Sequence, residues 1–157
     1  MNHSMLRAAG LLVLGLCVCV AGAEAADSCA LGAAPGERTV GRSEATDVAA
    51  YRIDVARHIY AAYGPCVLRG KLPPQIHAVV LIELAVGRDG MVRHVHFIRV
   101  PAEMPESVDL VEHMIRRIAP FPTAAIAGAE EVAFNEVWMF DEDGRFQLGA
   151  LTEGPTP

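Results

Sequence analysis

A strand-turn-strand pattern in the middle of the chain constrains the fold most. Two apolar runs rich in β-branched residues, 76–86 and 91–100, flank the tetrapeptide Gly87-Arg88-Asp89-Gly90. Asp-Gly between two such runs is a strong signal for a β-hairpin, because glycine takes the positive φ that the turn requires. Apolar residues fall on both faces of the first arm, so we expect a central strand covered on both sides.

The second arm of the hairpin poses a question of register. Strict alternation would put His94 and His96 on the same face as Val92. One extra residue near positions 93–94, a β-bulge, instead brings three apolar residues onto a common face and turns both histidines outward. Those apolar residues are Val92, Val95 and Phe97. We favour the bulge, which also places His96 opposite Glu83.

Helical periodicity appears on either side of the hairpin. Ser43 or Thr46 can cap a first helix that ends at Gly64-Pro65. A second helix is expected from residue 105 or 106 to Ile118, with acidic residues near its start and arginines near its end, which suits the helix dipole. The apolar positions of the first helix are Val48, Tyr51, Val55, His58 or Ile59, and Ala62.

A third long strand is predicted over residues 131–140, followed by a short return strand at 145–148. A right-handed crossover through the second helix sets the third strand antiparallel to the first arm when the two lie side by side. The order is helix-strand-strand-helix-strand. The sequence therefore predicts an α+β fold in which an antiparallel or mixed three-stranded sheet, in the order second-first-third, packs on two helices. The third strand keeps a free edge unless the return strand covers it.

The start of the chain has the three parts of a secretory signal: Arg7, an apolar stretch over 8–20, and the small-x-small site Ala23-Glu24-Ala25. We expect residues 1–25 to be a signal peptide cleaved near Ala25, with no stable membrane span afterwards. A retained N-terminal anchor is the alternative. Residues 26–42 then form a flexible leader, 43–150 the domain, and 151–157 a loose tail.

Charge and cysteine usage narrow the function further. The net charge of −6 leaves no basic stripe for phosphate contacts, which argues against nucleic acid as a partner. Removal of the signal leaves Cys29 and Cys66 as an even pair in an exported chain. We expect a disulfide between them, since exported proteins mature in oxidising compartments; two unrelated thiols are the alternative.

Few residues suggest chemistry. His94 and His96 share a face and Glu83 is a conceivable third ligand, but no further Cys or His cluster completes a tetrahedral metal site. We therefore expect no metal and no other cofactor, and keep a metal or small-ligand site at these three residues as the alternative. No serine lies in a Gly-x-Ser-x-Gly elbow, and a bridge explains Cys66 better than nucleophilic catalysis, so an enzyme is not expected.

Several of these features occur together in one known family. The run from Asp89 to Phe97, the helix that ends Met114-Ile115-Arg116-Arg117-Ile118, the Pro120-Phe121-Pro122 stop and the closing Trp138-Met139-Phe140 resemble the C-terminal domain of the TonB/TolA family. In that family a DGxVxxVxV hairpin precedes a helix with arginines near its end, an aromatic-proline segment and a last strand. The resemblance covers about residues 51–148.

The resemblance implies a periplasmic protein-binding module of a Gram-negative cell envelope. TonB-like domains pair the last strand with a segment of an outer-membrane transporter, a mode known as β-augmentation. Here it implies a partner-binding edge over Val132 to Phe140, with Asn135, Val137 and Trp138 as side chains to test; packing in the core is the alternative for Trp138. A homodimer paired through the sheet edge is a further possibility.

The chain departs from the energy transducers of that family. Those proteins keep an inner-membrane helix and a long Pro-rich linker, whereas residues 26–42 are too short to cross the periplasm at about 3.5 Å per residue. We therefore expect a stand-alone TonB-like domain. A component of an energy transducer remains the alternative if the N-terminal segment is kept as an anchor.

Overall fold

The computed structural model describes residues 29, 34–37, 39–124, 126 and 128–155. The predicted signal peptide, residues 1–25, lies outside the described residues, as does part of the predicted leader. Within the described ranges, no helix combines the length and the apolar character that crossing a membrane requires.

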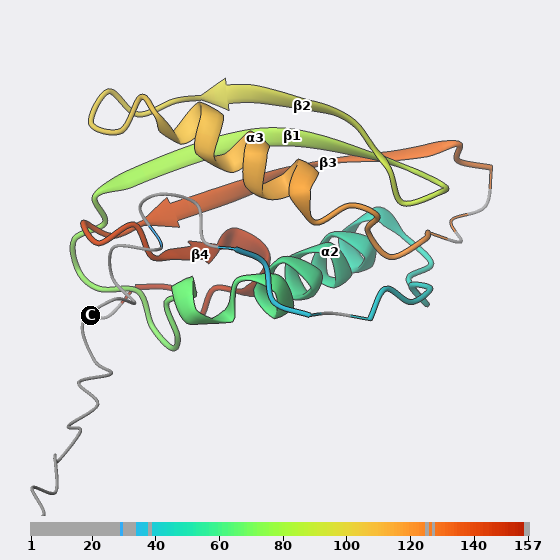
Figure 1. Cartoon of the computed structure of the whole chain (residues 1–157), viewed down its shortest axis with the longest axis horizontal. Coiled ribbons are helices and arrows are strands. Elements are labelled where there is room, and N and C mark those ends of the chain that lie inside the picture. The colour runs from blue at the N-terminus through green and yellow to red at the C-terminus, as the bar shows by residue number, and fades with distance from the viewer. Residues whose placement is uncertain (1–28, 30–33, 38, 125, 127, 156–157) are drawn as a thin grey trace, which may run out of the picture.

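The described residues form an α+β domain, as predicted. Both α-helices lie on one face of an antiparallel sheet, with α3 near β1 and β2 and α2 along β3 and β4 (Figure 1). The elements are α2 (Val48–Ala62), the 3₁₀ turn η1 (Gly64–Cys66), β1 (Ala78–Gly87), β2 (Val92–Arg99), α3 (Ser107–Arg117), β3 (Glu131–Phe140), β4 (Phe146–Leu148) and the 3₁₀ turn η2 (Gly149–Leu151).

The sheet has four strands in the order β2-β1-β3-β4. The predicted order of the three long strands is confirmed, and the crossover through α3 brings β3 antiparallel to β1 over an unbroken register from Ala78↔Phe140 to Gly87↔Glu131. The return strand, left optional by the sequence, forms as β4 and adds a fourth strand beside β3.

The predicted hairpin turn is confirmed. Gly90 has φ of 80°, a value that side chains disfavour, and its N–H donates to the carbonyl of Gly87 over 2.8 Å. A Cβ at Gly90 would also overlap the carbonyl oxygen of Phe121. A hydrogen bond from the Met91 N–H and a contact with Arg93 hold the pKa of Asp89 below its usual value, so this turn carboxylate stays charged.

The bulge in β2 is confirmed as well. Val86 pairs with Val92 while its neighbour Ala85 pairs with His94, so one residue of β2 is extra at this point. His96 lies opposite Glu83, as the register predicted. The hydrogen bond to Glu83 nevertheless comes from the diagonal neighbour, with His94 Nε2 3.1 Å from Glu83 Oε1.

The expectation that β1 is covered on both faces is wrong. Its helix-facing residues are buried, but Val79, Leu81 and Glu83 on the opposite face are only partly buried, and both helices lie on the other side of the sheet. Cross-strand neighbours provide the partial cover, since Val79 pairs with Met139 and Leu81 with Val137. Among the described residues, neighbouring strands and no helix cover this face of β1, so its apolar run reflects packing within the sheet.

The start of α2 differs from the sequence prediction. Asp47 is the N-cap, and its carboxylate accepts a hydrogen bond from the Ala50 N–H over 2.8 Å. Ser43 is engaged elsewhere, donating to Asp54 over 2.7 Å. Val48, expected on the apolar face, is 43% exposed, whereas Tyr51 of the same first turn is buried against Phe134.

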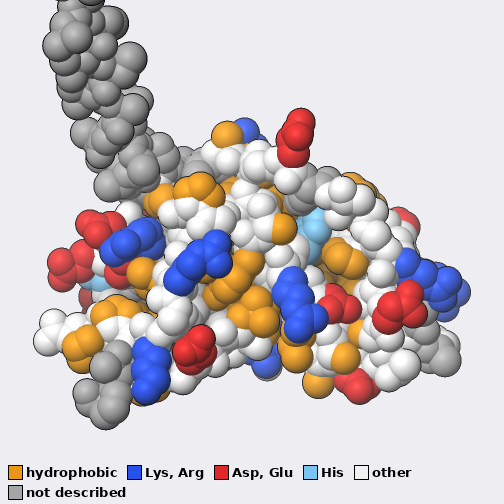
Figure 2. Space-filling model, turned by 90° about the horizontal axis from the view of Figure 1, so that it is seen from below, with side chains coloured by type: hydrophobic (Ala, Val, Ile, Leu, Met, Phe, Trp, Pro, Cys, Tyr) orange, Lys and Arg blue, Asp and Glu red, His pale blue; other side chains and the backbone are white. Residues whose placement is uncertain are grey.

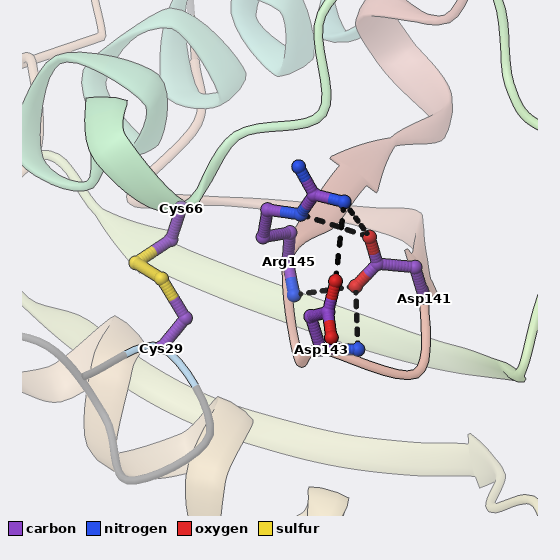
Figure 3. Close-up of a disulfide and its surroundings, with 5 residues drawn as sticks. All are labelled: Cys29, Cys66, Asp141, Asp143 and Arg145. Carbon is purple, nitrogen blue, oxygen red and sulfur yellow. Dashed lines mark hydrogen bonds and ion pairs between the residues drawn. A yellow bond between two sulfur atoms is a disulfide. The ribbon is translucent and has the colours of Figure 1, made fainter. Parts of the chain in front are cut away.

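The predicted disulfide is present. Cys29 and Cys66 are bonded with their Cα atoms 5.6 Å apart, and both residues are buried (Figure 3). The bond joins the segment before α2 to the turn that follows it. A disulfide of this kind is typical of an oxidising compartment.

Candidate functional site

The outer edge of β3 is closed in its C-terminal half. β4 pairs with β3 only from Trp138 to Phe140. At the next outward position, the Val137 N–H donates to the side chain of its own neighbour, Glu136 Oε1, over 2.9 Å. The same oxygen accepts the N–H of Ala150 in η2 over 3.1 Å, so η2 lies against the edge.

A buried ion pair holds this arrangement in place. Arg52 of α2 donates to Glu136 through two nitrogens, Nε to Oε2 and Nη2 to Oε1, each over 3.0 Å. The Glu136 side chain is 3% exposed and the Arg52 side chain 32%. Bidentate geometry and two further backbone donors offset the cost of burying the carboxylate. Glu136 therefore links α2, β3 and η2.

The outer edge of β4 is covered by the segment between η1 and β1, residues 67–77, which we call the connector. The Leu68 N–H donates to the Phe146 carbonyl over 2.8 Å, and the Gln147 side chain donates to the carbonyls of Leu68 and Gly70. Gly154 joins this layer, since the Leu72 N–H donates to its carbonyl over 3.0 Å, so the described part of the tail is not loose as predicted. From Val137 onward, this edge of the sheet is thus covered.

The N-terminal half of β3, residues 131–135, remains open. The Arg88 N–H donates to the Glu130 carbonyl. In this antiparallel register, the N–H and C=O groups of the even-numbered β3 residues therefore point toward β1. The backbone groups of Glu131, Ala133 and Asn135 therefore point outward, and all three residues are exposed. No strand or bridge of the described part of the chain pairs with them. We call residues 131–135 the open edge.

The opposite edge of the sheet is less suited to pairing. β2 carries register breaks at two places, near Arg93 and near Ile98, and both ends of the strand bear arginine. Bulges and charged side chains are the usual devices that keep an edge strand from pairing with another chain. The register of β3 has no such break.

The predicted partner-binding residues are separated by the structure. Asn135 is exposed on the open edge and Val137 is half-buried beside η2. Val132 faces the helices and is buried. Trp138 is a correction: it is fully buried, packed against Phe146 with ring centroids 4.8 Å apart, because it lies on the helix-facing side of β3. The core alternative therefore holds for this residue.

Glu136 is the site residue that the sequence prediction missed. The alternation Phe134, Glu136, Trp138 already placed its carboxylate on the buried face of β3. A carboxylate in that position needs a buried cation or several donors, and α2 offers Arg52 on the required side.

Of the three residues of the alternative metal or small-ligand site, only His94 and Glu83 are in contact. His94 and Glu83 are in contact, with His96 next along the strand, and all three side chains are accessible to solvent. Among the described residues, no group of three Cys, His, Asp or Glu side chains is placed to hold a metal ion.

A second candidate is a hollow of about 890 Å³ between the connector and the turn that joins β3 to β4. Its wall includes Pro73, Pro74 and the turn residues Asp141, Asp143 and Arg145. Arg145 is engaged by both carboxylates, at 2.8 Å from Asp141 and 3.4 Å from Asp143 (Figure 3). These contacts stabilise the turn, so its arginine and two of its carboxylates are already paired with one another.

Comparison with known proteins adds no assignment: no family model, no curated protein and no solved structure matches this chain.

Proposed function

We propose that this protein is a TonB-like protein-binding module of the periplasm that recognises an extended segment of a cell-envelope partner by strand addition. The open edge, residues 131–135, is the docking strand. This proposal keeps the last long strand that the TonB/TolA resemblance indicated and shortens the docking stretch to the half of β3 that β4 and η2 leave uncovered.

The observation that carries the proposal is a stretch of regular strand, unpaired among the described residues, in a sheet whose other edges are bulged or covered. Glu131, Ala133 and Asn135 offer outward N–H and C=O groups with no bulge between them. Backbone hydrogen bonds contribute roughly 0.5–1.5 kcal/mol each after exchange with water, so a short added strand gives a modest affinity suited to reversible contacts.

The proposed compartment and partner class rest on other features. The predicted signal peptide and the Cys29–Cys66 disulfide both favour an exported protein. An outer-membrane transporter is the partner class that the resemblance implies. A binding role accounts for the open edge better than a catalytic one.

The test places a photo-crosslinking amino acid at Ala133 in the exported, oxidised protein. We expect a crosslink to a defined partner segment in envelope preparations. An additional Asn135→Pro substitution removes one outward donor without breaking a hydrogen bond to β1, and should abolish the crosslink. Asn135→Ala keeps the N–H and should preserve it.

Two controls make this test decisive. The same photo-crosslinker at Glu112, which is on α3 and away from the edge, should not yield that product. Circular dichroism must show that both Asn135 variants remain folded. A crosslink from Ala133 that survives Asn135→Pro in a folded protein would rule out strand addition at this edge.

A further inference from the structure

The surface beside the open edge carries information about the segment that would bind there. α2 runs parallel to β3: Arg52 meets Glu136, the Tyr51 ring lies 6.1 Å from the Phe134 ring, and both elements begin on the same side of the molecule (Figure 1). One helical turn advances about 5.4 Å and one strand residue about 3.3 Å. The first turn of α2 is therefore level with about Phe134, alongside the open edge.

That first helical turn is apolar and exposed. Val48 is 43% exposed, and Ala49 beside it is also exposed. They lie about one turn before Arg52, on the side of α2 that faces the β3 edge. Figure 2, which views the molecule from below, shows hydrophobic side chains at several places on this face. A strand added to the open edge would thus place alternate side chains toward an apolar surface.

The border of this surface is acidic. Glu131 belongs to the open edge, Asp47 caps α2 one residue before Val48, and the side chain of Glu130 is 89% exposed. Figure 2 shows several acidic side chains on the side where α2 and β3 begin. Arg52 binds Glu136, and Arg88 lies 3.5 Å from Glu130, so Glu131 and Asp47 are the border acids that no cation contacts among the described residues.

We infer that the open edge selects an extended segment in which apolar and basic residues alternate. The apolar side chains would contact Val48 and Ala49 on the helix side. The basic side chains would lie on the open face of the sheet, near Glu131, where opposite charges across a strand pair attract. This inference rests on the proposed strand addition and adds the chemistry of the partner segment.

Defined peptides test it without knowledge of the natural partner. Three fluorescein-labelled heptapeptides are compared by fluorescence anisotropy with the oxidised protein: alternating valine and arginine, alternating valine and glutamate, and the first composition with its valines consecutive. We expect the alternating arginine peptide to bind about two- to fivefold more tightly than either of the others, since one cross-strand charge pair with Glu131 and the side-chain alternation favour it.

Protein variants then locate the contact. Glu131→Lys should weaken the arginine peptide severalfold, whereas Glu142→Lys makes the same change in net charge on the β3–β4 turn and should have little effect. Val48→Ser should also weaken binding, with the helix intact by circular dichroism. Equal effects of Glu131→Lys and Glu142→Lys would mean general attraction to an acidic protein and would overturn the inference.

The inference and the function can fail separately. If the arginine and glutamate peptides bind equally, or neither binds, while the Ala133 crosslink remains sensitive to Asn135→Pro, strand addition stands and the apolar-basic selectivity is wrong. If the arginine peptide binds and Asn135→Pro does not weaken it, the peptide does not use the open edge, and the inference is wrong whatever the crosslink shows.

Discussion

Removal of the buried carboxylate of Glu136 tests how the edge of β3 is closed. Glu136→Ala deletes a side chain that accepts four hydrogen bonds, two from Arg52 and one each from the N–H groups of Val137 and Ala150. Breaking a buried ion pair costs about 3–5 kcal/mol. The low end applies, because the surviving Arg52 side chain is 32% exposed and can turn to water. We expect the free energy of unfolding to fall by about 3 kcal/mol.

The reverse substitution should be more damaging. Arg52→Met leaves the Glu136 carboxylate, 3% exposed, without a cation. The double variant Arg52→Met with Glu136→Gln removes both charges and keeps the shape of both side chains, so it should be more stable than Arg52→Met alone. If the double variant has a lower free energy of unfolding than Arg52→Met alone, packing rather than the buried charge governs this contact, and the claim is wrong.

Urea unfolding followed by tryptophan fluorescence is the assay. Trp138 is the single tryptophan of the chain and is fully buried in the core, so its emission reports global unfolding. The Cys29–Cys66 bond must stay oxidised in every sample. A loss below about 1 kcal/mol for Glu136→Ala, the size of an ordinary surface change, would refute the account of this edge.

Three further predictions concern the fold. Replacing Cys29 and Cys66 with serine should lower the free energy of unfolding by about 4 kcal/mol in the chain-entropy model for a sequence separation of 37, and a loss under about 1 kcal/mol in urea titrations would contradict it. Gly90→Ala should cost about 2 kcal/mol or more, because the turn needs φ of 80° and a Cβ meets the Phe121 backbone; Gly128→Ala, also at positive φ but with open space around it, is the control. Burial, and secondarily the charge of Asp54, raises the pKa of Tyr51 to about 12. The proton is held more tightly in the folded state, so stability that is fully present below about pH 10 should fall as the pH rises toward 12, and Tyr51→Phe should flatten this part of a stability-pH curve.

The hairpin and the order of the long strands were readable from the sequence because their signals are local. Asp89-Gly90 specifies a turn, and the spacing of Val92, Val95 and Phe97 requires one extra residue in β2. The bounds of α3 and the end of α2 were likewise placed within about two residues, whereas the predicted caps of α2 were not the observed one.

The closure of the sheet edge could not be read in the same way. Whether a short run such as Phe146–Leu148 pairs with β3 depends on contacts with Tyr60 and the connector, which are distant in sequence. Trp138 was ambiguous for a related reason, since a strand aromatic can serve a core or an interface until the covering layer is known. Glu136 carried a usable signal in its alternation with Phe134 and Trp138, and only its partner on α2 was hidden.

Amide hydrogen exchange measured by NMR tests the open edge most directly. In the free, oxidised protein the outward amides of Ala133 and Asn135 should exchange fast, while Val132 and Phe134, which face β1, and Val137, which is bonded to Glu136, should be protected. The captured partner segment, added as a peptide, should protect Ala133 and Asn135 selectively. Protection of Ala133 and Asn135 equal to that of Phe134 in the free protein would show that this edge is already occupied and would contradict strand addition at residues 131–135.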